Sequence, residues 1–124
     1  MEQGVERLAA MLLLLTCLSH VAAPQAWASL FARIDASGDT AGLYVGAIHL
    51  PLGLMLVAFH NLWTWPEVLV TLIGWALLLK GTLHWVVPSL ARRSIAIGSE
   101  ASRYRWGGLL MLPLALALSW IALT

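Results

Sequence analysis

The fold of this chain is decided by residues 40–91, which read TAGLYVGAIHLPLGLMLVAFHNLWTWPEVLVTLIGWALLLKGTLHWVVPSLA. Only two side chains in this stretch, Glu67 and Lys80, belong to Asp, Glu, Lys or Arg. About 20 mostly apolar residues are enough for a helix to cross a bilayer. The stretch therefore predicts two membrane-spanning helices, at about 43–62 and 68–87, joined by a short turn.

Two further stretches, residues 8–32 and 106–124, contain no Asp, Glu, Lys or Arg at all. We expect them to hold helices at about 5–23 and 107–123, because only helical backbone satisfies its own hydrogen bonds in lipid. The whole chain of 124 residues is 60% apolar and 10% charged. This composition excludes a disordered chain, a basic nucleic-acid-binding domain and an ordinary water-soluble domain. The prediction is a single all-α domain, 1–124, of four transmembrane helices.

The first helix has a second interpretation, as a secretory signal peptide with Ala26-Trp27-Ala28 as its cleavage site. Signal peptides begin with a positively charged segment, whereas this chain begins with Glu2, Glu6 and Arg7. We therefore expect the first helix to be retained.

The two halves of the sequence resemble each other. His20-x-x-x-Pro24 is matched by His84-x-x-x-Pro88, and the Gly46 to Pro51 segment is matched by Gly108 to Pro113. These spacings predict an internal repeat, approximately 5–62 and 68–124, that forms two parallel-related helical hairpins. Each hairpin would contain an amphipathic connection lying in the membrane interface.

The connections at 24–42 and 88–105 carry five of the six arginines, with Lys80 close to the same side. The opposite side, with both termini, has only Arg7. Because basic residues accumulate on the cytoplasmic side, we expect the two connections to be cytoplasmic and both termini to be outside. A bacterial inner membrane is the expected location.

Ionisable side chains inside a membrane are costly, and they are candidates for function. Helix geometry places His20, His49, Lys80 and His84 in one layer of the inner half of the bilayer, with Met111 at the depth of His49. The layer has three interpretations: structural hydrogen bonds, a ligand-binding site for a small molecule, anion or lipid headgroup, or a metal or b-haem site. Kinks at Pro51 and Pro113 would leave space beside it.

A second group lies in the outer turn, where His60, Asn61 and Glu67 flank a tryptophan-rich segment. The group is explained by a tight turn anchored at the interface, or by a shared outer site. No CxxC, H-E-x-x-H, P-loop or dinucleotide motif is present in the sequence, so we expect no catalytic residues, no cofactor and no metal.

The turn and the helix after it also resemble a known group of proteins. The segments His60-Asn-Leu-Trp63 and Thr71-Leu-Ile-Gly-Trp-Ala-Leu-Leu-Leu-Lys80-Gly resemble small uncharacterised bacterial four-span membrane proteins, in which an H-N-x-W turn precedes a T-L-I-G-W-x-x-L-x-K-G helix. The resemblance implies that the shared positions are His60, Asn61, Trp63, Thr71, Gly74, Trp75, Lys80 and Gly81. It brings no assigned activity.

The leading functional hypothesis is a non-enzymatic accessory or scaffold protein that packs against itself or a partner in a larger membrane complex. Its partners would be the lipid bilayer and membrane proteins, without nucleic acid. The alternative is a small permease or a ligand- or lipid-binding protein with a polar pocket in the inner half of the bilayer. A subunit that binds b-haem or a metal is the third hypothesis.

Overall fold

The computed structural model describes residues 1–97 and 100–124, which form helices and their connections and no strand. Four helices are long and apolar enough to cross a membrane: α1 (Glu2–Ala22), α3 (Ala41–Phe59), α4 (Val68–Val86) and α6 (Ala101–Leu123). Two shorter helices, α2 (Pro24–Ala36) and α5 (Ser89–Ile97), and a 3₁₀ turn, η1 (Gly38–Thr40), connect them. The prediction of an all-α chain with four candidate spans is confirmed.

Most helix boundaries lie within three residues of their expected positions, but α6 begins six residues early, at Ala101. No glycine or proline interrupts residues 101–106, so the helix extends back through the Arg103-Tyr-Arg-Trp segment. Arg103 and Tyr104 therefore belong to the first turns of a long helix rather than to the interfacial connection. Part of that connection, residues 98 and 99, lies outside the described residues.

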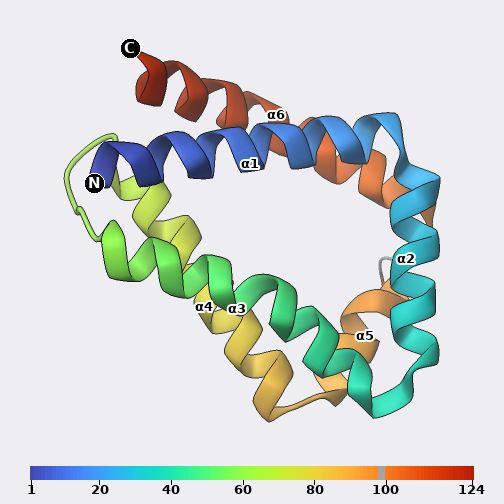
Figure 1. The fold of residues 1–124 in the computed structure, drawn as a ribbon. Helices are drawn as coiled ribbons and strands as arrows, with labels where there is room; N and C mark the ends of the chain where they lie inside the picture. The colour runs from blue at the N-terminus through green and yellow to red at the C-terminus, as the bar shows by residue number, and fades with distance from the viewer. Residues whose placement is uncertain (98–99) are drawn as a thin grey trace.

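The long helices form two arms that meet at one end of the molecule (Figure 1). One arm is the pair α1 and α6, and the other is the pair α3 and α4. At the narrow end, where both termini and the 60–67 turn lie, an apolar cluster joins all four helices. It consists of Val5, Ala10, Leu56, Val70 and Leu118. At the wide end, α2 and α5 link the arms over a second cluster, made of Ile34, Ala41, Val45, Ala91 and Ile95.

The structure does not confirm the hairpins expected from the repeat, in which α1 would pack on α3 and α4 on α6. The extended contacts are instead α3 with α4 and α1 with α6. The physical reason lies in the connections. The short 60–67 turn holds α3 against α4, whereas the 13-residue helix α2 carries α3 away from α1.

The packing of α3 on α4 depends on glycines that bring the two backbones together. A Cβ atom at Gly42 would lie 2.5 Å from the carbonyl oxygen of His84, and one at Gly53 would lie 2.8 Å from the Cα of Leu78. On α4, a Cβ at Gly81 would lie 2.9 Å from the backbone nitrogen of Leu50. Small residues that allow such close approach are typical of helix pairs in membranes.

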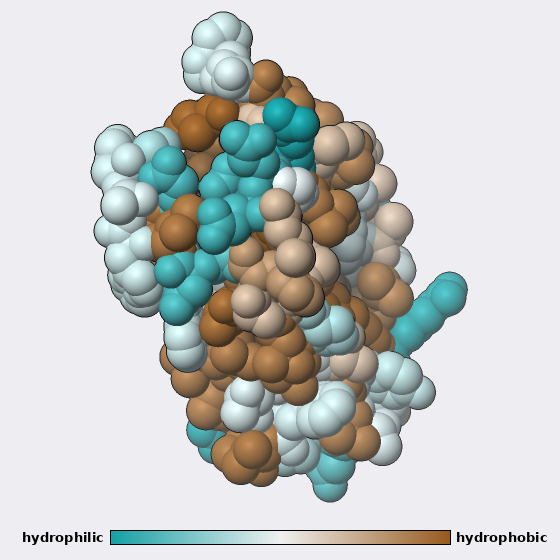
Figure 2. Space-filling model, turned by 60° about the vertical axis from the view of Figure 1, so that its left-hand side comes forward, coloured by the Kyte–Doolittle hydropathy of each residue, from teal (hydrophilic) through white to brown (hydrophobic). Residues whose placement is uncertain are grey.

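Large apolar side chains face outward along both arms. Leu110, Val86 and Trp120 are each more than 70% exposed. Figure 2, in which the narrow end comes forward, shows apolar side chains over much of the surface, one large group of hydrophilic side chains in the upper part and a few separate ones at the lower and right edges. An outward-facing apolar surface of this extent is the arrangement expected of helices in contact with lipid.

Candidate functional site

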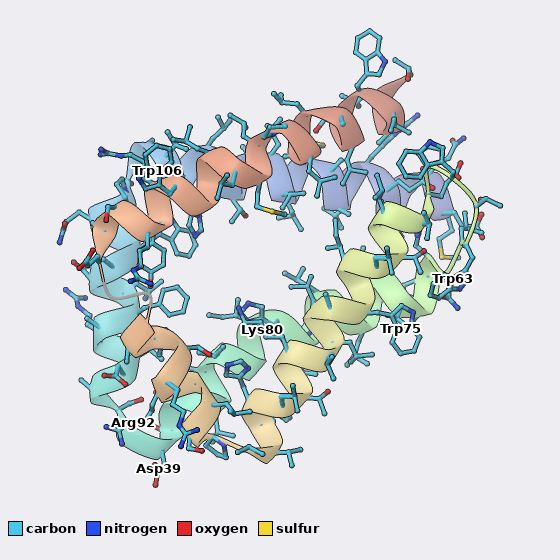
Figure 3. All side chains as sticks on the ribbon, turned by 180° about the vertical axis from the view of Figure 1, so that it is seen from behind. Asp39, Trp63, Trp75, Lys80, Arg92 and Trp106 are labelled. Atoms are coloured by element: carbon cyan, nitrogen blue, oxygen red, sulfur yellow. The ribbon has the colours of Figure 1, made fainter. Side chains whose placement is uncertain are left out.

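The candidate site begins with Lys80 and His84, which are one turn apart on the same side of α4. Lys80 projects toward the space between the arms (Figure 3). Among the described residues, no carboxylate lies within 4 Å of its ammonium group. His84 is only 5% exposed. An unpaired lysine in an apolar helix is a functional candidate, because the bilayer offers it no compensating charge.

Three of the four histidines orient their rings in the same way. In each, Nδ1 donates a hydrogen bond to the carbonyl oxygen four residues earlier: His20 to Thr16 at 2.8 Å, His49 to Val45 at 2.7 Å and His84 to Lys80 at 2.6 Å. Because Nδ1 carries the proton, Nε2 of the neutral ring has a free lone pair. In His84 this Nε2 is buried and has no hydrogen-bond partner among the described residues.

Lys80 and His84 line a pocket of about 230 Å³ at the wide end, which we call the basic pocket. Arg103 reaches it from α6 and has no carboxylate within 4 Å in the described part of the chain. Five helices contribute to its wall, which is completed by Phe31, Val45, Ala91, Ser94, Ile95 and Tyr104. The pocket thus combines two cations that lack a carboxylate partner with one buried polar atom that lacks any partner.

A second pocket, of about 300 Å³, lies between α1 and α6, and we call it the apolar pocket. Arg103 and Tyr104 belong to both pockets. The remaining lining residues are Leu13, Thr16, Cys17, His20, Gly107, Gly108 and Met111. The two pockets therefore meet at Arg103 and Tyr104. From there the apolar pocket extends along the α1/α6 arm.

Four rings, from His20, Trp27, Phe31 and Tyr104, form an aromatic cluster where α1, α2 and α6 meet. The His20 ring stacks on Trp27 with 4.2 Å between centroids, and Phe31 stacks on Tyr104 at 5.8 Å. The indole nitrogen of Trp27 also donates a hydrogen bond to Ser19 Oγ at 2.9 Å. The cluster fixes Tyr104 at the junction of the two pockets.

The predicted layer is thus divided between the two pockets. His84 and Lys80 lie in the basic pocket, while His20 and Met111 lie in the apolar pocket. His49 is half-buried on α3 and lines neither pocket. No group of three His, Cys, Asp or Glu side chains in the described residues is arranged to hold a metal ion.

The outer-turn residues have separate partners. His60 is fully buried, and its Nε2 lies 2.8 Å from Glu6 Oε1 on α1. Asn61 Oδ1 accepts a hydrogen bond from the indole nitrogen of Trp75 at 3.3 Å. Glu67 accepts one from Thr64 at 3.0 Å, so the three residues are not gathered around a common space.

Sequence reasoning did not identify two residues that matter here, Arg103 in the pockets and Glu6 beside His60. Arg103 could have been found by extending the last helix back to Ala101, since nothing in residues 101–106 breaks a helix. Glu6 could not, because it lies 54 residues from His60 and no local pattern connects them.

No family model, curated protein or solved structure matches the chain. The resemblance based on the H-N-x-W turn and the helix after it stays a prediction. The functional argument therefore depends on the geometry of the two pockets.

Proposed function

We propose that this chain is a non-enzymatic membrane protein that binds an anionic ligand in the basic pocket. The observation that supports this most directly is the buried Nε2 of His84, which has no hydrogen-bond partner among the described residues and belongs to a side chain that lines the pocket together with Lys80 and Arg103. A buried polar atom without a hydrogen bond costs stability, and a ligand that supplies the missing bond removes this cost. Of the functions considered above, ligand binding in a polar pocket accounts for this arrangement.

The electrostatics of the pocket favour an anion. Arginine keeps its charge at all physiological pH values and presents a planar fork that matches carboxylate and phosphate groups. The ion pair at the wide end, Arg92 with Asp35 at 3.6 Å, joins α5 to α2. Within residues 1–97 and 100–124, no carboxylate lies within 4 Å of the charged groups of Arg103 or Lys80. With no carboxylate beside them, the two cations would both gain from an anionic ligand.

For the scaffold hypothesis, the small-residue surfaces of α3 and α4 offer a partner little, because their glycines pack within the chain. Gly42, Gly46 and Gly53 face α4, and Gly74 and Gly81 face α3. Their contact surfaces are therefore already covered. The outward apolar faces of both arms are accounted for by contact with lipid, and self-association stays a prediction.

In the membrane, we propose that the wide end is cytoplasmic and that both termini are outside. The wide end carries Arg33 on α2, Arg92 and Arg93 on α5, and Arg103 and Arg105 at the start of α6. The narrow end carries Arg7, whose side chain donates to the carbonyl oxygen of Ala122 at 3.0 Å. Positive charge on the cytoplasmic side supports this orientation. The basic pocket would then open in the inner half of the bilayer.

We also propose that the chain contains an internal repeat, with α1–α3 as one unit and α4–α6 as the other. In this arrangement each long helix packs against a long helix of the other unit instead of its own. If α1–α3 and α4–α6 are equivalent, the pair α1/α6 corresponds to the pair α4/α3. Corresponding contacts support this: a Cβ at Gly108 would meet Val21, and a Cβ at Gly46 would meet Trp85, which is the counterpart of Val21. The two arms would then be related by a pseudo-twofold axis.

Replacing Lys80 by glutamine should weaken anion binding without disturbing the fold, because Lys80 is exposed and its ammonium group has no carboxylate within 4 Å in the described residues. The full-length protein is purified in detergent and titrated with 1-oleoyl lysophosphatidic acid, with binding measured by native mass spectrometry. A lost charged hydrogen bond contributes about 1.5–3 kcal/mol, so the dissociation constant should rise by roughly tenfold or more.

The matched control is Arg33→Gln, which removes a cation from exposed α2 outside the basic pocket. It should leave the dissociation constant unchanged. Equal affinities for the wild type and Lys80→Gln, or equal losses in Lys80→Gln and Arg33→Gln, would contradict a specific basic pocket.

The orientation can be tested with single cysteines in a Cys17→Ser background. Thr64→Cys, in the exposed turn of the narrow end, should react with a membrane-impermeant maleimide added to intact cells. Ser37→Cys, exposed after α2, should react only after the membrane is permeabilised. The reverse pattern of labelling would refute the proposed topology.

A further inference from the structure

We infer that the ligand is an amphiphile with a phosphate monoester head, whose head lies in the basic pocket and whose single apolar chain lies in the apolar pocket. This inference rests on the proposed anion-binding function and adds the class of ligand. Its starting point is that the two pockets share Arg103 and Tyr104. A ligand seated on Arg103 therefore has a cationic environment on one side and the α1/α6 arm on the other.

The character of the two linings matches the two ends of such a molecule. Beyond the shared residues, the basic pocket offers Lys80 and His84, while the apolar pocket offers Leu13, Cys17 and Met111. Each volume, about 230 and 300 Å³, is at or below the lower limit of roughly 300–1,000 Å³ that is typical of a complete ligand site. Both linings are mainly apolar, and they differ in their cations, because Lys80 lines only the basic pocket. Two small pockets that share Arg103 and Tyr104 fit one ligand with its charged head beside Lys80 and its chain along the α1/α6 arm.

The hydrogen-bonding state of His84 favours some ligand headgroups over others. Its Nδ1 donates to the Lys80 carbonyl oxygen, so Nε2 of the neutral ring requires a hydrogen-bond donor from the ligand. A phosphate monoester has a second pKa of about 6, so it can share its remaining proton with an imidazole while its other oxygens accept bonds from Arg103 and Lys80. A fatty-acid carboxylate has no second proton to offer once it is ionised. The buried imidazole thus favours phosphate.

Gly107 provides a way to close the apolar pocket without disturbing the helix pair. It lines this pocket, and a Cβ placed on it would have no heavy atom within 4 Å. Its neighbour Gly108 is different, because a Cβ there would lie 2.7 Å from the carbonyl oxygen of Cys17 on α1. A large side chain at 107 can therefore be added at the border of the pocket without overlap, whereas one at 108 would separate α1 from α6.

The test compares four ligands on the full-length protein in detergent: 1-oleoyl lysophosphatidic acid, oleate, 1-oleoyl lysophosphatidylcholine and glycerol 3-phosphate. We expect lysophosphatidic acid to bind at least about tenfold more tightly than each of the others. Gly107→Phe should weaken its binding by at least about tenfold. Gly4→Phe, at an open position of α1 that lines neither pocket, is the matched control and should have no effect.

The outcomes separate the inference from the proposed function. Equal binding of glycerol 3-phosphate and lysophosphatidic acid, with no effect of Gly107→Phe, would overturn the amphiphile and leave the anion site intact. Equal binding of oleate and lysophosphatidic acid, still weakened by Lys80→Gln, would overturn the phosphate head alone. No binding by any of the four, or binding that Lys80→Gln does not change, would overturn the inference and the proposed function together.

Discussion

Gly53→Val is expected to prevent α3 from packing on α4 and to lower the melting temperature of the protein more than any other single change considered. A Cβ at this position would meet the backbone nitrogen of Leu78 and lie 2.8 Å from its Cα. Both atoms belong to the main chain of α4, so no side-chain rotation can relieve the overlap. The helices would have to separate along the middle of the arm.

The expected loss is large because the substitution acts on backbone contact. Overpacking a core against movable side chains costs about 1–3 kcal/mol, and we expect about 3 kcal/mol or more where the obstacle is backbone. Thermal unfolding of the detergent-solubilised protein, followed by tryptophan fluorescence, measures the shift. Seven tryptophans in the chain make this signal strong.

Gly4→Val is the matched control, since a Cβ at Gly4 would meet nothing within 4 Å. Valine is also a slightly better helix former than glycine, so this variant should be as stable as the wild type or a little more so. Similar melting temperatures for Gly53→Val and Gly4→Val would show that α3 and α4 do not pack as described.

Glu6→Ala is expected to loosen the junction of the two arms. Glu6 Oε1 lies 2.8 Å from Nε2 of His60, whose side chain is fully buried at the end of α3. The other ring nitrogen, Nδ1, lies 3.3 Å from Thr71 Oγ1, and this hydroxyl donates to the carbonyl oxygen of Leu62 at 2.7 Å. Thr71 Oγ1 therefore accepts from Nδ1, and Nε2 is hydrogen-bonded to Glu6.

Removing one partner of such a buried pair leaves the other unsatisfied. Because Glu6 keeps 16% of its side-chain surface exposed, we expect the cost of a hydrogen-bonding group left without its partner, about 1–3 kcal/mol, whereas losing an exposed ion pair costs about 1 kcal/mol or less. The expected result is a clear fall in melting temperature for Glu6→Ala and for His60→Ala. In the double variant the loss should be smaller than the sum of the two, because neither partner remains to be left unpaired.

Glu2→Ala is the control for Glu6→Ala, because Glu2 is an exposed acid in the first turn of the same helix. Its loss should cost only the modest interaction of a carboxylate with the helix dipole. Equal shifts for Glu2→Ala and Glu6→Ala, or strictly additive effects of Glu6→Ala and His60→Ala, would contradict a structural role for the pair.

The positions of the spans could be predicted from the sequence, whereas the pairing of the helices could not. Charge-free stretches locate helices because a charge inside lipid is costly, and α4 was found within one residue of each end. Pairing depends on which small residues meet across two uniformly apolar surfaces. Gly46 is a landmark of the repeat in the sequence, but the sequence alone does not show that Trp85 on α4 packs against it.

The candidate site was predicted only in part, for a related reason. Lys80 and His84 share a helix, so their proximity follows from the helical repeat. Arg103 lies on a different helix, and the hydrogen-bond partner of His60 lies on α1. Contacts between residues so far apart in the sequence can be identified only once the packing of the helices is known. The unpartnered Nε2 of His84 is likewise a property of the packed molecule, since the sequence gives no sign of what surrounds the ring.

Because the two arms converge at the narrow end, a small tilt at their junction would move their far ends by a larger distance. A helix of 19 residues such as α4 is roughly 28 Å long, so a tilt of about 5° at the junction would displace its far end by about 2.5 Å. The far ends of the arms are where α2 and α5 border the basic pocket. Small adjustments around Glu6 and His60 on one face of the bilayer are thereby amplified into changes of pocket width near the other.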